Sequence, residues 1–541
     1  MTPKEPIIAD AGRSTQPADT NISTISPSGR GLRLAILAGL LLFLANPPVG
    51  LWPLAWFAVA PAIVSVCRAR HTRQAAWRGY VFGWAFLGPT WYWVGLTVNA
   101  WTRSSIGWLA WAALTAILAG FYALWGALAW NIARRTSDGW RIIAIGAAWV
   151  VVEWMRTLGP LSMPWAQLSY TQWRFPPLLQ GADVTGAYGI SFALLLVSGG
   201  AAHFWLHRKE AQPTRYLWAG SLMLVLLTLY GLARMQRAET GPRLAVAAMQ
   251  DNLNPLERFD DREYVRTFAD LTQQAAQSTP APELFVWSEA SAPDDVLHKP
   301  DATGMLREAG MKYNAGVIVG TDTVTAGGVA HSSLLFPEDD RTPVHYDKQQ
   351  LVPFGEFIPF RSLWPAALRD SFGFFREDVT PGNNATILAF NTNNNTTVAV
   401  GPFICYESMY PQYARAMTRA GANLLVTQSN DAWFQSRAAQ EQHMAAVVLR
   451  AVENRRAVVR STTNGITGFI NSNGQITRQA PRNTAAFVTG EVILSSGRSL
   501  YVRCGDWFVG LCVLLVLLAL AGKLVETEKK PKRTPPPTPP S

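Results

Sequence analysis

The chain has 541 residues, of which 49% are hydrophobic and only 16% are charged. That length allows two or three domains, and the composition argues against a purely soluble protein and for a membrane protein. The formal net charge is +10, but the basic residues cluster in short loops between apolar runs and in the C-terminal tail. This distribution indicates membrane topology rather than nucleic-acid binding.

The N-terminal half predicts a tail followed by a membrane domain. Residues 1–30 are rich in Ser, Thr, Pro and Gly, without periodicity, and are expected to be disordered. A membrane domain of about seven helices is expected over residues 31–242. Some of its apolar runs are shorter than the roughly 20 residues that a bilayer core requires. The runs are residues 34–45, 54–66, 79–97, 108–132, 142–154, 187–206 and 216–233.

The C-terminal end of the chain predicts one more span. Residues 501–525 contain an apolar run over 507–524 and are expected to form the last transmembrane helix, giving about eight spans. Residues 526–541 are rich in Pro and Lys and predict an extended tail.

Orientation follows from the loops, because cytoplasmic loops carry the excess of Lys and Arg. Every second loop is rich in basic residues, whereas the others hold few, such as Arg103, Arg156 and Arg174. The rich loops and tail contain Arg30, Arg33, Arg68, Arg70, Arg73, Arg78, Arg134, Arg135, Arg141, Arg208, Lys209, Arg215, Lys523, Lys529, Lys530, Lys532 and Arg533. Both termini are therefore expected in the cytoplasm of a bacterium, with residues 243–500 on the periplasmic side of its inner membrane.

Residues 243–500 have ordinary globular composition and predict one large water-soluble domain. Short apolar or β-branched runs alternate with helical patterns, which favours an α/β domain whose sheets are covered by helices. Strands are expected at residues 244–250, 284–287, 316–320, 333–336, 398–401, 424–429 and 458–461. Helices are expected at residues 263–277, 305–313, 410–420 and 440–453.

Three segments of this domain place a reactive side chain where a predicted strand ends, which is where α/β folds usually present their chemistry. They are Phe285-Val-Trp-Ser-Glu289, Tyr346-Asp-Lys348 and Gly401-Pro-Phe-Ile-Cys405. A thiol becomes a good nucleophile only when a base removes its proton, and Glu289 is the candidate base for Cys405. Lys348 and the backbone N–H of Tyr406 suit the oxyanion of an acyl-transfer intermediate. This chemistry requires no metal and no cofactor.

Each signal alone also has a structural interpretation. Cys405 fits a small core residue, Glu289 a neighbour of a helix N-terminus, and Lys348 a solvated surface lysine. Their joint occurrence at strand ends favours catalysis. The Ser429-Asn-Asp431 segment is interpreted as a loop that lines the pocket, and His443 as a structural residue.

In order and spacing, these three segments resemble the Glu–Lys–Cys triad of the nitrilase superfamily, and the whole chain resembles the apolipoprotein N-acyltransferase family. The resemblance covers nearly everything except the two tails. Its further matching phrases are residues 50–56, 163–172, 183–192, 351–356, 429–434 and 450–455.

The resemblance implies a fold and a reaction. The soluble domain would be a nitrilase-like αββα sandwich joined to the polytopic helical bundle. A phospholipid, typically phosphatidylethanolamine, would give its acyl chain to Cys405 as a thioester. The α-amine of the N-terminal S-diacylglyceryl-cysteine of an apolipoprotein would then accept that chain as an amide.

Family-important positions are carried over by the same resemblance. Glu289, Lys348 and Cys405 would be catalytic, and Glu356, Tyr406 and Glu407 would shape the site around them. Trp165, in the outer loop before the sixth span, would control lipid access, or else belong to an interfacial aromatic belt. The family is expected to have Trp where this chain has Phe259. Residues 362–378 are expected to form a mobile apolar arm near the bilayer.

Two other classes of function compete with the acyltransferase. A membrane-tethered nitrilase-type amidase would use the same thiol chemistry on a soluble amide, but such a substrate gives no reason for seven preceding spans. A non-catalytic membrane scaffold would be expected to have lost a triad residue, whereas this chain has all three. The sequence therefore favours transfer between lipids.

Overall fold

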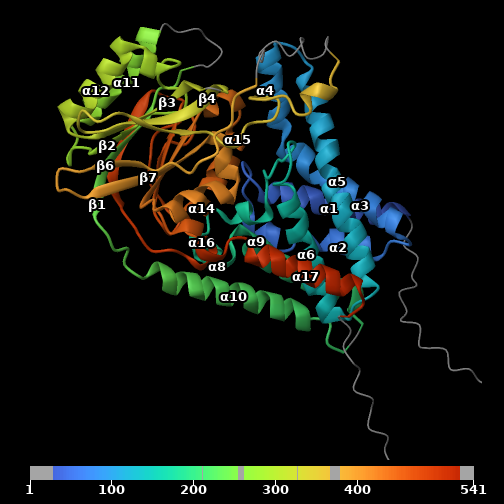
Figure 1. Ribbon diagram of the computed structural model, residues 1–541. Coiled ribbons are helices and arrows are strands. Elements are labelled where there is room, and N and C mark those ends of the chain that lie inside the picture. The colour runs from blue at the N-terminus through green and yellow to red at the C-terminus, as the bar shows by residue number, and fades with distance from the viewer. Residues whose placement is uncertain (1–27, 210, 254–260, 326, 366–377, 524–541) are drawn as a thin grey trace, which may run out of the picture.

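The computed structural model describes residues 28–523 except residues 210, 254–260, 326 and 366–377 (Figure 1). A bundle of helices lies on one side of the molecule and two β-sheets with their covering helices lie on the other. Several sequence predictions concern residues outside the described ranges. They are the prediction for Phe259, most of the predicted arm over residues 362–378, most of the N-terminal tail and the whole C-terminal tail.

The bundle is built from the N-terminal helices together with the last helix of the chain. Its principal members are α1 Ser28–Ala45, α2 Ala60–Cys67, α3 Thr72–Thr90, α4 Tyr92–Thr102, α5 Gly107–Ala133, α6 Asp138–Met155, α9 Ala187–His207, α10 Arg215–Met235 and α17 Trp507–Leu520. Short elements connect them: η1 Trp52–Trp56, η2 Leu168–Gln172, α7 Pro176–Leu179, α8 Ala182–Thr185 and α16 Leu500–Cys504. Among the described residues, α5, α9 and α10 are long and apolar enough to cross a membrane.

Two predicted spans differ from single helices. The run over 79–97 is divided at Trp91, where α3 ends and α4 begins, and Pro89 lies in the last turn of α3. A proline cannot donate the backbone hydrogen bond that would continue the helix, which favours a break there. The run over 54–66 is likewise divided, because η1 and α2 each begin with a proline in their first turn.

The region predicted to be the soluble domain, residues 243–500, contains two six-stranded sheets. The first has the order β12-β1-β2-β3-β4-β5 and the second has the order β11-β10-β9-β8-β7-β6. The strands are β1 Arg243–Gln250, β2 Leu284–Val286, β3 Gly316–Thr325, β4 Gly328–Phe336, β5 Val344–Asp347, β6 Leu388–Asn391, β7 Thr397–Ile404, β8 Leu424–Ser429, β9 Val458–Thr462, β10 Gly468–Ile470, β11 Ile476–Gln479 and β12 Ala486–Ile493. All seven predicted strands are present.

The sheets face each other and helices cover their outer sides, which gives the expected layered α/β arrangement. Helices α11 Asp261–Ala275 and α12 Pro300–Tyr313 cover the first sheet, and α14 Pro411–Ala420 and α15 Arg437–Asn454 cover the second (Figure 1). Between the sheets, the Ser461 hydroxyl donates to the Met249 carbonyl at 2.6 Å. All four predicted helices of the domain are present.

Helix α15 lies between the second sheet and the bundle, and its side chains from Ala438 to Asn454 are buried. The amide of Gln442 reaches into the bundle, where it donates to the Pro47 and Thr90 carbonyls, each at 3.1 Å. The first residue of α9, Ala187, donates its backbone N–H to the Glu453 carboxylate at 2.9 Å. The soluble domain is therefore held against the bundle by buried polar contacts as well as by apolar packing.

Candidate active site

The thiol of Cys405 is placed by a turn at the end of β7. Strands β7 and β8 are parallel neighbours, so Cys405 and the segment after Ser429 emerge at the same edge of the sheet. Cys405 has a φ of 49°, a left-handed conformation that is unfavourable for a residue with a side chain. Such conformations concentrate at functional sites. Cys405 is 8% exposed.

Lys348 lies between two carboxylates. Its Nζ donates to Glu289 Oε1 at 3.1 Å and to Glu356 Oε1 at 2.5 Å, and its side chain is fully buried. The second oxygen of Glu289 accepts the backbone N–H of Asn430 at 2.7 Å, and the second oxygen of Glu356 accepts that of Val352 at 2.9 Å. Both carboxylates therefore have fixed orientations around one ammonium group.

Burial and the charges of neighbouring groups set the protonation states of Glu289, Lys348 and Cys405. Burial by itself would raise the pKa of Glu289, but the positive charges of Lys348 and His331 outweigh burial and hold it below its usual range. Burial would lower the pKa of Lys348, but the charges of Glu289 and Glu356 raise it well above its usual value. Burial and the charge of Glu289 raise the pKa of Cys405. The resting site therefore contains a carboxylate, an ammonium group and a neutral thiol.

Glu407, two residues after Cys405, is fully buried and accepts several hydrogen bonds. Its carboxylate accepts from the Tyr346 hydroxyl at 2.7 Å and from the backbone N–H groups of Gln349 at 2.7 Å, Gln350 at 3.2 Å and Ile404 at 2.6 Å. These bonds tie the segment that follows Lys348 to the end of β7, which precedes Cys405. Glu407 thereby fixes the separation of two of the candidate catalytic groups.

Tyr406 and Trp165 connect the site to the bundle. The Tyr406 hydroxyl donates to the Ser162 carbonyl at 2.7 Å, and its ring stacks on Trp165 with centroids 6.3 Å apart. Trp165 is 1% exposed and packs against Trp93 and Phe434. This is the environment of a core residue rather than of an aromatic ring at the lipid–water interface.

A buried polar network lies behind Cys405. His443 Nε2 is 3.0 Å from the Cys405 carbonyl oxygen, and its Nδ1 is 3.1 Å from Asp431 Oδ1. Arg460 donates to Asp431 Oδ2 at 2.7 Å, and Ser429 donates to Asp431 Oδ1 at 2.7 Å. The side chains of His443, Asp431 and Arg460 are fully buried. The network links the backbone of Cys405 to the loop after β8.

The structure brings the three predicted catalytic residues, together with Glu356, into one charge-coupled group, since the charge of each carboxylate acts on both Lys348 and Cys405. The prediction missed the contact of His443 with Cys405, because those residues come from different elements and no sequence signal joins them. Among the residues that the structure describes, the one cluster with metal-ligand spacing lies in the bundle, at Asp138, His203 and His207.

Comparison with known proteins agrees with this arrangement. The family profile described as "Apolipoprotein N-acyltransferase N-terminal domain" matches residues 38–200, and that described as "Carbon-nitrogen hydrolase" matches residues 243–501. The chain is 33% identical over 510 residues to the apolipoprotein N-acyltransferase of Geobacter metallireducens, covering 91% of this chain and 95% of the relative. It is 30% identical over 517 residues to that of Pseudomonas putida, covering 93% and 99%.

Among solved structures, the chain is similar to a carbon–nitrogen hydrolase from Helicobacter pylori, with 15% identity and a TM-score of 0.37, covering 48% of this chain and 92% of the other. Fold, site and family profiles together define a carbon–nitrogen hydrolase domain, nitrilase-like in fold, joined to a bundle of apolar membrane helices. The relatives match this chain along nearly its whole length. The chain belongs to the apolipoprotein N-acyltransferase family.

Proposed function

We propose that this protein transfers an acyl chain from a phospholipid to the α-amino group of the N-terminal S-diacylglyceryl-cysteine of apolipoproteins, through a thioester on Cys405. Phosphatidylethanolamine is the proposed donor. The observation that carries the proposal is the buried ammonium group of Lys348, held between Glu289 and Glu356 beside a thiol. Family membership supports the choice of lipid substrates.

The first half-reaction forms the thioester. The Cys405 sulfur attacks the ester carbonyl of the donor while Glu289 takes the thiol proton. The pKa of the thiol lies above its usual range and that of Glu289 below, so this proton moves as the sulfur attacks rather than in the resting enzyme. Lys348 and the backbone N–H of Tyr406 stabilise the oxyanion. The intermediate then collapses, and the lysophospholipid leaves with the proton from Glu289.

The second half-reaction consumes the thioester. The free α-amine of the lipidated cysteine attacks the thioester carbonyl, and Glu289 removes a proton from the attacking nitrogen. The carbon–sulfur bond breaks, the thiol is restored and an amide is formed. Glu356 orients Lys348 throughout, Glu407 and Tyr406 hold the loops, and Trp165 supports the face of the site that adjoins the bundle.

The proposed domain limits and membrane topology suit an enzyme whose substrates are lipids in the bilayer. The domains are residues 1–30, 31–242, 243–500, 501–525 and 526–541, with about eight spans in the bacterial inner membrane. Both termini are cytoplasmic and residues 243–500 are periplasmic, as the basic loops favour. Alkaline phosphatase fusions within residues 243–500 and at the C-terminus would be active and inactive, respectively. The opposite pattern would refute this topology.

Intact-mass measurement tests the first half-reaction. Purified protein incubated with phosphatidylethanolamine is expected to gain one acyl group that hydroxylamine releases, and Cys405→Ser is expected to gain none. Cys504→Ser is the matched control, because Cys504 is an exposed cysteine outside the site. Addition of a diacylglyceryl-cysteine peptide should then remove the adduct and yield an N-acylated peptide. A wild-type protein that binds the lipid without forming an adduct would instead favour the amidase or the scaffold.

A further inference from the structure

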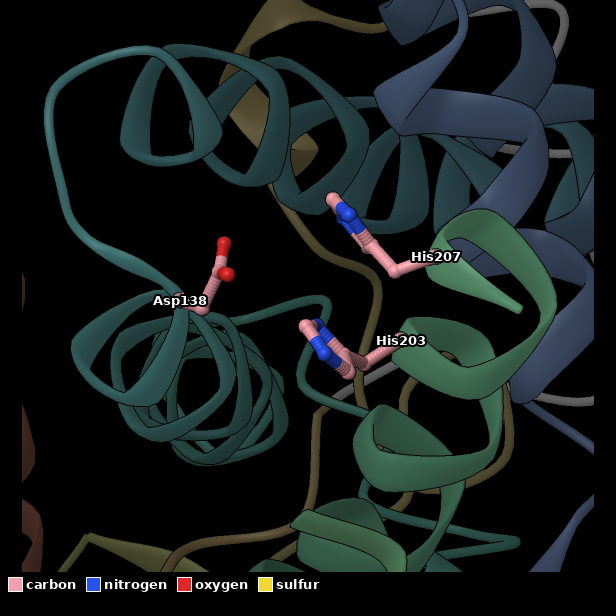
Figure 2. Close-up of side chains that lie close together, drawn as sticks. All are labelled: Asp138, His203 and His207. Atoms are coloured by element: carbon pink, nitrogen blue, oxygen red, sulfur yellow. The ribbon is translucent and has the colours of Figure 1, made fainter. Parts of the chain in front are cut away.

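Three side chains of metal-ligand type meet at the end of the bundle where α6 begins and α9 ends. They are Asp138, the first residue of α6, and His203 and His207 in the last two turns of α9. One ligand atom from each residue lies within 4.8 Å of the others. Figure 2 shows the Asp138 carboxylate on one helix facing the two imidazoles on the other.

The spacing of the two histidines suits a shared ligand. Residues four apart in a helix lie on the same face, one turn above the other. The two rings are stacked with centroids 4.4 Å apart, and both residues line a cavity together with Cys67 and Arg141. His203 is 5% exposed, whereas Asp138 and His207 are half-buried, so a bound ion would be partly enclosed by the bundle.

The donor set identifies the class of ion. Two imidazole nitrogens and one carboxylate, with a position left for water, are typical ligands of Zn²⁺ and similar divalent transition metals. Bonds of about 2.0–2.1 Å in a tetrahedral site place ligand atoms about 3.3 Å apart. The ligand atoms would therefore need to close by about 1.5 Å at most, and at least one of the two stacked imidazoles would need to turn so that both nitrogens point at the ion.

The contacts of Asp138 leave room for this role. Arg141 donates to its Oδ1 at 2.8 Å, and Arg215 lies 3.9 Å from its Oδ2. A carboxylate has about four lone-pair sites, and carboxylates that bind metals usually accept such hydrogen bonds as well. The two guanidinium groups orient the carboxylate, but their positive charges oppose that of a cation. We therefore expect moderate affinity.

We propose that Asp138, His203 and His207 form a binding site for one divalent transition-metal ion of the zinc class. The ion would join the N-terminal end of α6 to the C-terminal end of α9. Its role would be structural, because the cluster lies in the bundle and shares no residue with the group around Cys405. The acyl-transfer chemistry proposed above does not depend on it.

The test measures metal binding to the full-length protein, purified without a polyhistidine tag, treated with a chelator and then transferred to metal-free buffer. Zn²⁺ is titrated by calorimetry, and Co²⁺ is used as a spectroscopic probe of a four-coordinate site. The variants are His207→Gln and Asp138→Asn, since neither side chain is fully buried. His298→Gln is the matched control, because His298 pairs with Asp295 at 2.8 Å but is exposed and has no second histidine in a cluster.

The wild type and His298→Gln are expected to bind one Zn²⁺ per chain, with a dissociation constant in the micromolar range, and to show the visible bands of four-coordinate Co²⁺. His207→Gln should weaken Zn²⁺ binding by at least about 100-fold and remove the Co²⁺ bands. Asp138→Asn should weaken binding by about 10-fold or more. Circular dichroism would show that the variants are folded. Equal binding by wild type and His207→Gln, or no binding by the wild type, would overturn the proposal.

Discussion

Replacement of Lys348 by methionine gives the sharpest test of the charge arrangement. The ammonium group of Lys348 lies 3.1 Å from Glu289 and 2.5 Å from Glu356, in a fully buried position. Methionine keeps the unbranched shape and most of the length of the side chain, but it lacks the terminal ammonium group with its charge and its hydrogen bonds. In the wild type, Glu289 and Glu356 share the Lys348 cation. In the variant, the two carboxylates would face each other without a positive charge between them.

The size of the effect follows from the distances. At an effective dielectric constant of about 20, each ion pair contributes about 5–7 kcal/mol of Coulomb energy. Part of this is offset by the cost of removing charges from water. Breaking a buried pair therefore costs about 3–5 kcal/mol in practice. For a domain of this size, that loss lowers the midpoint of thermal unfolding by about 6–20 °C.

Lowering the pH and adding a second substitution should each restore part of the stability that Lys348→Met loses. Without the cation, repulsion and burial raise the pKa of Glu289 above its value in the unfolded chain. The stability deficit of Lys348→Met is then largest at neutral pH, shrinks as the pH falls through the raised pKa of Glu289, and is smallest below about pH 4.3, where Glu289 is mostly protonated in the unfolded chain as well. Adding Glu356→Gln removes one of the two unpaired charges, so the double variant should regain part of the lost stability.

The rate of thioester formation distinguishes the catalytic effect of losing the Lys348 charge from its effect on stability. The double variant still lacks the Lys348 ammonium group, and loss of one oxyanion donor typically costs about 10²–10³ in rate. Thioester formation, followed by intact mass at several times, should therefore stay at least about 100-fold slower in both variants. Thermal unfolding is measured in the same samples. Acylation within tenfold of wild type, or equal unfolding midpoints for the single and double variants, would refute this reasoning.

Three further predictions concern the residues around the nucleophile. His443→Ala removes a contact to the Cys405 carbonyl and should slow acylation by about tenfold. The test is the acylation rate of the folded variant, and His443→Gln should recover part of that rate. Glu407→Gln replaces an acceptor of four hydrogen bonds by a group that also donates, and should lose about 3 kcal/mol of stability in denaturant unfolding. Burial would raise the pKa of Asp431, but the charge of Arg460 and the bond from His443 hold it well below its usual range. Its contribution to stability is therefore complete above about pH 3.9 and lost as the pH falls further, so Asp431→Asn should unfold with a weaker acid dependence.

Much of the soluble domain was predictable because its central strands are buried on both faces. Strand β8 is buried throughout and its predicted limits match those observed. The five strands that the sequence did not indicate, β5, β6, β10, β11 and β12, are short or lie at or near the sheet edges. Strand β12 is largely half-exposed and is defined by its pairing with β1, some 240 residues earlier. Such pairing leaves no local pattern in the sequence.

The candidate site divides in the same way. Glu289, Lys348 and Cys405 each follow a strand, and strand ends can be located from local sequence. The contact between His443 and Cys405 joins residues 38 positions apart, from the middle of one helix and the end of one strand. A histidine inside a helix has no pattern that indicates what its ring will meet. Only the packing of α15 across the second sheet determines that contact.

The site depends on the bundle as well as on the soluble domain. The hydroxyls of Tyr406 and Tyr410 both donate to the Ser162 carbonyl, at 2.7 and 3.1 Å, and Ser162 lies in the loop after α6. Trp165 from the same loop stacks on Tyr406 and packs against His443, which contacts the nucleophile. The loop from the bundle therefore forms one wall of the environment of Cys405. The same contacts that anchor the domain against the bundle therefore also fix the position of Cys405, the proposed nucleophile.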